Sequence, residues 1–331
     1  MMMSEALVAY SWQMSQWQDM QRLIDSGRLP HALLLAGPES IGKLRFAKAL
    51  AAYLLCESPS QFAACGQCRS CHFQLDGSNP DYREISPDEG KRQIGIDQVR
   101  SLQRFSAQRA HRDGGRKLVV IYPAEAMNIF TANALLKTLE EPTSNTVLIL
   151  ISHSSSQLLA TIRSRCVQFR FGIPDAGLVE SWLKDYVGDQ NLVKTLLAES
   201  GGRPLAAKKI FEEDGLALLQ SFDSALSALF TGQKTPLNLA DELLDKDILQ
   251  VLDWWCTRLM DLSRHQLAAQ SMVAKSWLEF TSVPPRFVMD TLQRGLELRS
   301  SFGRGVALNK RLVLEALFIE WMALCRRSAA R

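Results

Sequence analysis

The sequence predicts an α/β protein in which a parallel sheet with helices on both faces is followed by an all-helical second half. Two observations carry this prediction. As far as Gly172, short apolar runs alternate with segments of helical periodicity, a pattern that favours parallel strands joined by crossover helices. After Gly172 only helical periodicity remains. It is broken at residues 200–204, 231–236 and 282–286, where Gly and Pro indicate turns.

Five strands are expected in the first half, in residues 31–37, 81–87, 117–122, 145–152 and the stretch that ends at 171. The runs HALLLAG and KLVVIY are almost wholly apolar, which is typical of strands buried on both faces of a parallel sheet. Helices with one apolar face are expected between the strands, in residues 44–56, 96–110 and 131–142. Pro142 ends the last of these helices because proline cannot continue the helical hydrogen bonds.

The domain organisation follows from the length and from the change of pattern. A chain of 331 residues is too long for one small hydrophobic core and indicates several domains. We expect an α/β domain in residues 1–172, a small helical domain in residues 173–211 and a larger helical domain in residues 212–331.

The composition is that of a soluble globular protein, with 47% hydrophobic and 22% charged residues. No apolar run of about 20 residues is present, so we expect no membrane span. The first residues carry no basic segment followed by an apolar one, so we expect no signal peptide and a cytoplasmic location. The net charge of +3 is too small to predict nucleic-acid binding alone.

Four of the seven cysteines crowd into sixteen residues as a C-x8-C-x2-C-x2-C array, formed by Cys56, Cys65, Cys68 and Cys71. Two successive C-x2-C steps let three thiolates converge in one turn, and four thiolates suit tetrahedral zinc. A closed four-thiolate site has no position for water, so the predicted zinc, one per chain, is structural. Free cysteines by chance and a redox pair are the alternatives. The adjacent His72 is interpreted as a surface residue.

Some single residues are assigned to the hydrophobic core. Cys166, Cys256 and Cys325 lie in apolar stretches and are expected to be core cysteines. In residues 248–265 apolar side chains recur at steps of three and four, which is typical of a helix with one apolar face. For Trp255 core and interface are both open, and core is preferred. For Trp254 the pattern leaves both core and interface open.

Residues 37–43 read GPESIGK, the frame of a phosphate-binding loop between a strand and a helix. Gly37, Gly42 and Lys43 could cradle phosphates with backbone N–H groups and an ammonium. The next position needs a Ser or Thr hydroxyl for Mg²⁺, and Leu44 cannot supply one. Weak nucleotide binding through Lys43 and a solvated surface lysine are both open at this stage.

The acidic half of a nucleotide site is also incomplete. A second strand should end in an Asp-Glu pair that holds the metal and orients the attacking water. Pro123 and Ala124 follow the strand at 117–122, and Glu125 is the only nearby carboxylate, displaced along the chain. We therefore expect no productive ATP hydrolysis by this chain alone.

Taken together, GRLPHALLLAGPESIGK, the cysteine insert, NALLKTLEEP and TIRSRC resemble the bacterial clamp-loader family of AAA+ proteins. The resemblance covers Gly27 to Cys166. It implies a RecA-like AAA+ domain, a helical lid in residues 173–211 and an oligomerisation collar in residues 212–331. It also implies a hetero-pentameric ring with gamma/tau and delta subunits, which loads the sliding beta clamp onto primed DNA for DNA polymerase III.

The same resemblance assigns roles to individual residues. Leu44, Pro123 and Ala124 depart from the gamma/tau subunits, which keep the Mg²⁺-binding groups, and so indicate a member without ATPase activity. The Ser164-Arg165-Cys166 motif would face the ATP site of the adjacent gamma/tau subunit, with Arg165 as an arginine finger in trans. The alternative for Arg165 is a surface residue, and an intrachain ion pair is expected for Arg163. Two polar positions correspond to sensors of active relatives, Ser152 and Arg203.

Two other functions compete with this hypothesis. One is a self-sufficient, gamma/tau-like ATPase with an unusual metal site. The other is a zinc-dependent DNA-binding module, which the small net charge and the lack of aromatic residues between basic residues in the cysteine segment disfavour.

Overall fold

The computed structural model describes residues 7–61, 63–111, 115–143, 145–268, 275–303 and 305–329. The chain divides into two compact units, residues 1–208 and residues 209–331, which are described separately. The predicted division into three domains stays a prediction, because residues 173–208 belong to the same unit as the α/β core.

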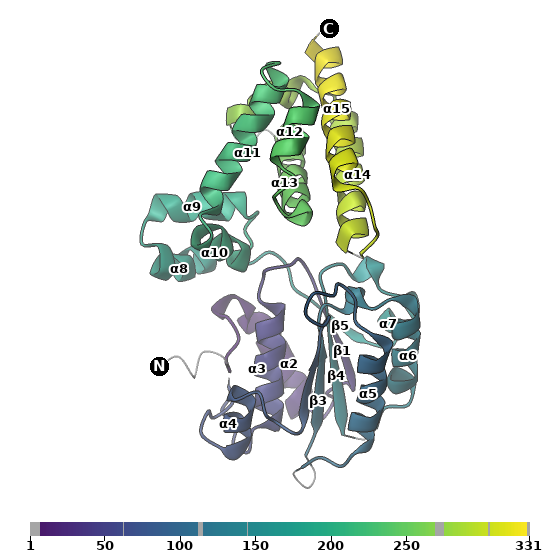
Figure 1. Ribbon diagram of the computed structural model, residues 1–331. Coiled ribbons are helices and arrows are strands. Elements are labelled where there is room, and N and C mark those ends of the chain that lie inside the picture. The colour runs from purple at the N-terminus through teal and green to yellow at the C-terminus, as the bar shows by residue number, and fades with distance from the viewer. Residues whose placement is uncertain are drawn as a thin grey trace. The chain divides into compact units, whose positions relative to one another are not determined.

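The first unit contains a five-stranded parallel sheet in the order β2-β3-β4-β1-β5 (Figure 1). The strands are β1 (Ala32–Ala36), β2 (Tyr82–Ile85), β3 (Lys117–Ile121), β4 (Thr146–Ser152) and β5 (Val167–Arg170). The predicted α/β class and all five predicted strands are confirmed.

Helices cover both faces of this sheet (Figure 1). Along β1, Leu33 and Leu35 face α2 (Met14–Asp25) and α3 (Lys43–Leu55), whereas Leu34 faces the opposite core. That opposite core contains apolar side chains of the helices α5 (Ile96–Ala107), α6 (Ile129–Glu140) and α7 (Ala160–Arg163). Alternate residues of a strand point to opposite faces, so a strand buried on both faces is apolar at nearly every position, and here the polar exceptions Lys117, Thr146 and Ser152 lie at strand ends.

Shorter elements complete the first unit. They are η1 (Ser11–Gln13), α4 (Arg69–Leu75), η2 (Ala124–Ala126), η3 (Ser155–Gln157), α8 (Ala176–Val187), α9 (Gln190–Glu199) and α10 (Pro204–Glu212), whose last turn crosses into the second unit. The sequence did not predict η1, α2 or α4.

The second unit is all-helical, as predicted. Its elements are α11 (Gly215–Phe230), α12 (Pro236–Glu242), α13 (Ile248–Ala268), η4 (Lys275–Ser282), α14 (Pro285–Gly303) and α15 (Lys310–Ala329). Trp255 lies in the core of this unit, with Trp277 and Trp321 around it, and Trp254 is half-buried against the same core. Cys256 and Cys325 are core residues as expected.

One buried ionic group lies within this helical core. The Arg258 guanidinium donates to both oxygens of Asp223, at 2.8 and 2.6 Å, and the Trp277 Nε1–H donates to the same carboxylate at 3.1 Å. A buried charge is tolerated only when it is paired and hydrogen-bonded, which is the case here. Within the described residues, no helix is both long enough and apolar enough to cross a bilayer.

Candidate functional site

The phosphate loop lies where the sequence predicts it, between the end of β1 and the start of α3. Gly37 allows a close approach, because a Cβ atom there would lie 2.0 Å from the carbonyl oxygen of Phe171. Gly42 precedes α3 with φ +90°, and a Cβ there would lie 2.6 Å from the Tyr10 ring. Both glycines are required by the packing around the loop, whether or not phosphate binds.

Lys43 is turned inward into its own loop. Its Nζ donates to the carbonyl oxygens of Gly37, at 2.6 Å, and Pro38, and it lies 3.1 Å from His153 Nδ1. An ammonium has three N–H donors, so these three partners use all of them. The residue is only 3% exposed, and the solvated surface lysine considered from the sequence is therefore wrong. Burial lowers the pKa of Lys43 to about 8, although Glu125 and Glu39 act in the opposite direction.

The N-terminal segment fixes the loop from one side. Trp12 Nε1–H and the Gln13 side-chain amide both donate to the Ile41 carbonyl, each at 3.1 Å. Arg45, in the first turn of α3, donates to the Val8 carbonyl at 2.8 Å and lies 4.1 Å from the centre of the Tyr10 ring. These contacts tie the loop and the start of α3 to the N-terminal segment.

Four aromatic rings join this segment to α8. Tyr10 and Trp12 stack with ring centres 4.3 Å apart, and Trp182 meets both edge-on at 5.7 and 5.1 Å. Tyr186 extends the cluster on the α8 side. The N–H of Leu205, at the start of α10, also donates to Ser40 in the loop at 3.0 Å. The loop is thus tied to residues on both sides of it in the sequence.

The Mg²⁺-binding groups are missing in three dimensions as well. Leu44 is half-buried and packs against the sheet core, and Ala124 is fully buried. Glu125 Oε1 accepts the His153 backbone N–H at 2.8 Å, and its Oε2 is buried without a hydrogen-bond partner. A hollow of about 400 Å³ remains beside the loop, lined by Lys43, Lys48, Tyr122 and His153 among others. The Lys43 ammonium that lines this hollow already donates to acceptors of its own chain.

The two sensor positions have local partners. Ser152 is fully buried at the end of β4, where its Oγ accepts the Ser154 N–H at 3.1 Å and its carbonyl accepts the Gly37 N–H at 3.3 Å. The Arg203 Nε–H donates to the Ser200 carbonyl at 2.7 Å. Both contacts are structural, and the sensor roles stay predictions.

The Ser164-Arg165-Cys166 motif follows α7, and each of its three side chains has different surroundings. Ser164 Oγ donates to the Thr161 carbonyl at 3.1 Å, which closes the end of the helix. Cys166 is half-buried against the sheet core, and burial raises the pKa of its thiol to about 11. Between them, the Arg165 side chain is 36% exposed. The motif therefore anchors a guanidinium at the protein surface.

An ion pair occurs at Arg165 rather than at Arg163. Arg165 Nη2 lies 2.7 Å from Glu140 Oε1, and Nη1 donates to the Thr161 carbonyl at 3.0 Å. Arg163 is exposed and has no side-chain partner within the described ranges, so the ion pair expected there was wrong.

The four cysteines of the predicted zinc site converge. The Sγ atoms of Cys56, Cys65, Cys68 and Cys71 all lie within 4.8 Å of one another. The Cys56–Cys68 and Cys65–Cys71 pairs are 3.9 Å apart and the Cys56–Cys71 pair is 3.7 Å apart. Zinc with four sulfurs at about 2.3 Å in a tetrahedron requires S–S separations of about 3.8 Å. The cluster therefore fits this ion, whereas a disulfide needs about 2.0 Å.

Backbone geometry prepares these sulfurs for a cation. The N–H groups of Cys65, Cys68 and Cys71 donate to the preceding sulfur of the array at 3.2 to 3.4 Å. Backbone N–H groups of Gln67 and Cys68 lower the pKa of the Cys65 thiol to about 6. Burial raises the pKa of the Cys56 and Cys71 thiols. A bound cation would favour all four thiolates, and exposed His72 lies outside the cluster.

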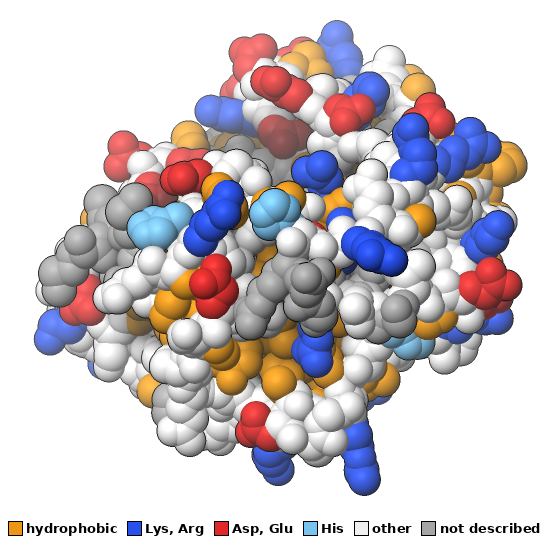
Figure 2. All heavy atoms as spheres, turned by 90° about the horizontal axis from the view of Figure 1, so that it is seen from below, with side chains coloured by type: hydrophobic (Ala, Val, Ile, Leu, Met, Phe, Trp, Pro, Cys, Tyr) orange, Lys and Arg blue, Asp and Glu red, His pale blue; other side chains and the backbone are white. Residues whose placement is uncertain are grey.

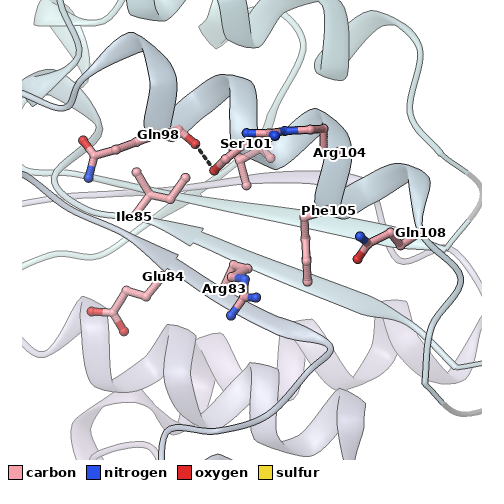
Figure 3. A pocket seen from close by; sticks show the side chains of 9 residues that line it. Arg83, Glu84, Ile85, Gln98, Ser101, Arg104, Phe105 and Gln108 are labelled. Atoms are coloured by element: carbon pink, nitrogen blue, oxygen red, sulfur yellow. Dashed lines mark hydrogen bonds between the residues drawn. The ribbon is translucent and has the colours of Figure 1, made fainter.

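A second hollow, of about 450 Å³, lies at the β2 edge of the sheet, between β2 and α5 (Figure 3). Ile85 points toward α5, whereas Glu84 points away from it (Figure 3) and pairs with Lys48 at 2.9 Å. Arg83 lies 5.4 Å from the centre of the Phe105 ring. Neither paired carboxylates nor a nucleophile with a base lines this hollow, so it offers no catalytic arrangement.

The charged side chains on one face of the molecule do not favour a stand-alone DNA-binding module. On the face shown in Figure 2, basic and acidic side chains of the described residues are interspersed, with hydrophobic side chains near the centre. Nucleic-acid binding requires Lys and Arg gathered into one patch or stripe, and this face has none among the residues drawn in colour.

Comparison with known proteins identifies related chains. Residues 12–174 match the family model described as "DNA polymerase III, delta subunit", and residues 213–323 match its C-terminal counterpart. The DNA polymerase III subunit delta′ of Pseudomonas aeruginosa is 36% identical over 95% of this chain and 98% of its own length. The subunit of the same name from Escherichia coli K12 is 34% identical over 79% of this chain and 78% of its own. A solved gamma-subunit-related protein of Thermotoga maritima covers 94% of this chain and 100% of its own, at 20% identity and TM-score 0.42.

Several residues at the site were not found by sequence reasoning. They are the aromatic residues Tyr10, Trp12 and Trp182, which close the phosphate loop, and Glu140, which contacts Arg165. Glu140 was visible in the TLEEP stretch, but its partner could not be identified because the two residues are far apart in sequence. The aromatic residues carried no motif at all.

Proposed function

Because the chain belongs to the family of DNA polymerase III delta′ subunits, we propose that it serves as the delta′ subunit of a clamp loader. In this role it joins gamma/tau and delta subunits in a hetero-pentamer that places the sliding beta clamp on primed DNA, at the replisome in the cytoplasm. It does not hydrolyse ATP itself. Its Arg165 completes the ATP site of the adjacent gamma/tau subunit.

One observation carries this proposal: the two cations suited to phosphate are arranged in opposite ways. Lys43 is buried and meets three acceptors of its own chain, whereas Arg165 is exposed beyond the end of α7. A guanidinium at a surface can bridge phosphate oxygens of a nucleotide held by another subunit and stabilise charge in the transition state. A self-sufficient ATPase would need Lys43 available to phosphate.

The test uses rings in which the other subunits have lost their own arginine fingers, so that only the ATP site facing this chain turns over. Arg165→Ala should lower DNA-stimulated ATP hydrolysis in such rings by about 10³-fold, the lower end of the range for arginine fingers. Arg163→Ala is the matched control, because Arg163 is exposed and lies two residues away. Ring assembly, measured by gel filtration, should survive both changes. Unchanged hydrolysis with Arg165→Ala would overturn the proposal.

The cysteine cluster has a structural role in this proposal. Four converging sulfurs leave no coordination position for water, so a zinc ion there would stabilise the segment around α4 rather than activate a nucleophile. Elemental analysis should find about one zinc per chain. Cys68→Ser should lose this zinc without reaching the Arg165 contacts. A chain purified without chelators that holds no zinc would contradict this role.

The helices after Gly172 complete the proposal. Residues 173–211 would form the lid and residues 212–331 the collar, through which the five subunits assemble. Co-purification with gamma/tau and delta subunits tests this assembly, and removal of residues 212–331 should abolish it.

A further inference from the structure

Glu140 is the only acidic group that contacts Arg165 within the described residues. It is the last residue of α6, and Arg165 follows α7. The Glu140 Oε1–Arg165 Nη2 distance is 2.7 Å, and the Glu140 side chain is 48% exposed. The contact therefore lies at the surface, at the place where Arg165 would meet a neighbouring subunit.

The guanidinium is held at two points. Nη2 meets Glu140, and Nη1 meets the Thr161 carbonyl at 3.0 Å. A guanidinium is planar and has five N–H donors in a fixed fork. Two contacts on different nitrogens fix its plane and leave the remaining donors for a ligand. A free arginine has several rotatable bonds, and ordering it costs conformational entropy, which these contacts reduce beforehand.

We propose that Glu140 is a positioning residue that orients Arg165 toward the triphosphate of the neighbouring subunit. The inference rests on the proposed function of Arg165 and adds the group that makes this arginine effective. Exposed ion pairs are weak, so the pair restrains the guanidinium but lets it adjust when phosphate arrives. Glu140 does not touch the nucleotide in this scheme, and it acts through Arg165 alone.

The chain offers a matched control at the next position. Glu141 has the same side chain and is exposed, and it makes no side-chain contact in the part of the chain that the structure describes. A change that depends only on surface charge near the end of α6 should appear in both residues. A change that depends on the contact with Arg165 should appear in Glu140 alone.

The experiment measures DNA-stimulated ATP hydrolysis in assembled rings whose only active ATP site faces this chain. Glu140→Ala should lower kcat about tenfold, as expected when a catalytic group loses its orientation, and KM for ATP should change less than twofold. Glu140→Gln retains an oxygen acceptor and should recover most of the rate. Glu141→Ala should leave kcat unchanged. The double variant Glu140→Ala/Arg165→Ala should be no slower than Arg165→Ala, because Glu140 acts only through that residue.

The outcomes separate this inference from the proposed function. If Arg165→Ala has no effect, the arginine-finger function itself is wrong. If Arg165→Ala is slow but Glu140→Ala matches the parent protein, only the positioning role is overturned. Equal losses for Glu140→Ala and Glu141→Ala would also overturn it, because the effect would then be one of general charge. Gel filtration of each ring confirms that the subunit has assembled.

Discussion

The phosphate loop and the Arg165 surface belong to the same compact unit, yet the cation is buried in the first and exposed in the second. At the loop, the Lys43 ammonium is enclosed by the Gly37 and Pro38 carbonyls and by His153. At the Arg165 surface, the guanidinium is exposed and has two contacts for five donors. The difference teaches that one unit can hold one cation by contacts within its own chain and leave another exposed at its surface.

The conformation of the phosphate loop is explained by its packing. A loop with a buried ammonium and no phosphate would leave costly unpaired donors. Here the Gly37 and Pro38 carbonyls accept from the ammonium, and Trp12, in the Tyr10–Trp12–Trp182 cluster, donates to the Ile41 carbonyl of the loop. The glycines remain necessary because side chains at positions 37 and 42 would collide with Phe171 and Tyr10.

The largest expected effect concerns the geometry of the exposed cation. Arg165→Lys keeps the charge but loses the planar fork, so two phosphate oxygens can no longer be bridged. We expect a loss of about 10³-fold in single-turnover hydrolysis at the neighbouring ATP site, nearly as large as for Arg165→Ala. Recovery of most of the rate with lysine would show that charge alone is sufficient at this surface.

The buried cation should reveal itself in the pH dependence of stability. The pKa of Lys43 falls from 10.5 to about 8 in the folded chain, so between these values the unfolded chain binds the extra proton. Stability due to this group therefore rises as the pH rises from 8 to 10.5 and is lowest below pH 8, where the buried ammonium is charged. Each pH unit is worth about 1.4 kcal/mol. The free energy of unfolding, relative to Lys43→Met, should rise by about 3 kcal/mol over this interval.

Urea unfolding of the two proteins at pH 7.5, 8.5, 9.5 and 10.5 measures this difference. Other groups that titrate in the interval are common to both proteins and cancel in the comparison. A difference that is independent of pH would show that Lys43 is not buried as a cation, and the contrast with Arg165 would then disappear.

The sequence predicted the strands and motifs of both regions better than the contacts between their side chains. The strands at 117–122 and 145–152 were evident because the interior of each is a continuous apolar run, as expected of a strand buried on both faces. The helix over Met14–Asp25 was missed, although Trp17 and Met20 occupy one face at a spacing of three residues and are both buried.

For the site, the spacing of the four cysteines was sufficient, because all the ligands lie within one short segment. The inward turn of Lys43 depends on the carbonyl orientations of residues 37 and 38 and on His153, which is 110 residues away. No local pattern contains that information. The contact between Glu140 and Arg165 was hidden for the same reason.

A smaller effect tests whether the loop is held closed by the N-terminal segment. Gly42→Ala puts a Cβ against the Tyr10 ring and also forces alanine into a left-handed conformation. Gly27→Ala is the control, because Gly27 has a similar conformation, with φ +68°, but open space around it. Both variants carry the conformational cost of about 1 kcal/mol, and Gly42→Ala should lose about 2 kcal/mol more through overpacking. Equal losses of unfolding free energy in urea would mean that the Tyr10 ring moves aside at little energetic cost.

The smallest effect is expected for a substitution that restores one missing residue of the nucleotide-binding motif. Leu44→Thr restores the hydroxyl that a Mg²⁺ site requires next to the lysine. ATP hydrolysis by the isolated chain should nevertheless stay at background, because Lys43 keeps its three acceptors and Ala124 still stands at a buried position without a carboxylate. The measurement is steady-state phosphate release by the purified chain, with Leu44→Val as a control of similar shape. Turnover by Leu44→Thr that Leu44→Val lacks would show that one hydroxyl separates this loop from an active one. The closed loop would then be a consequence of the missing metal rather than an independent barrier.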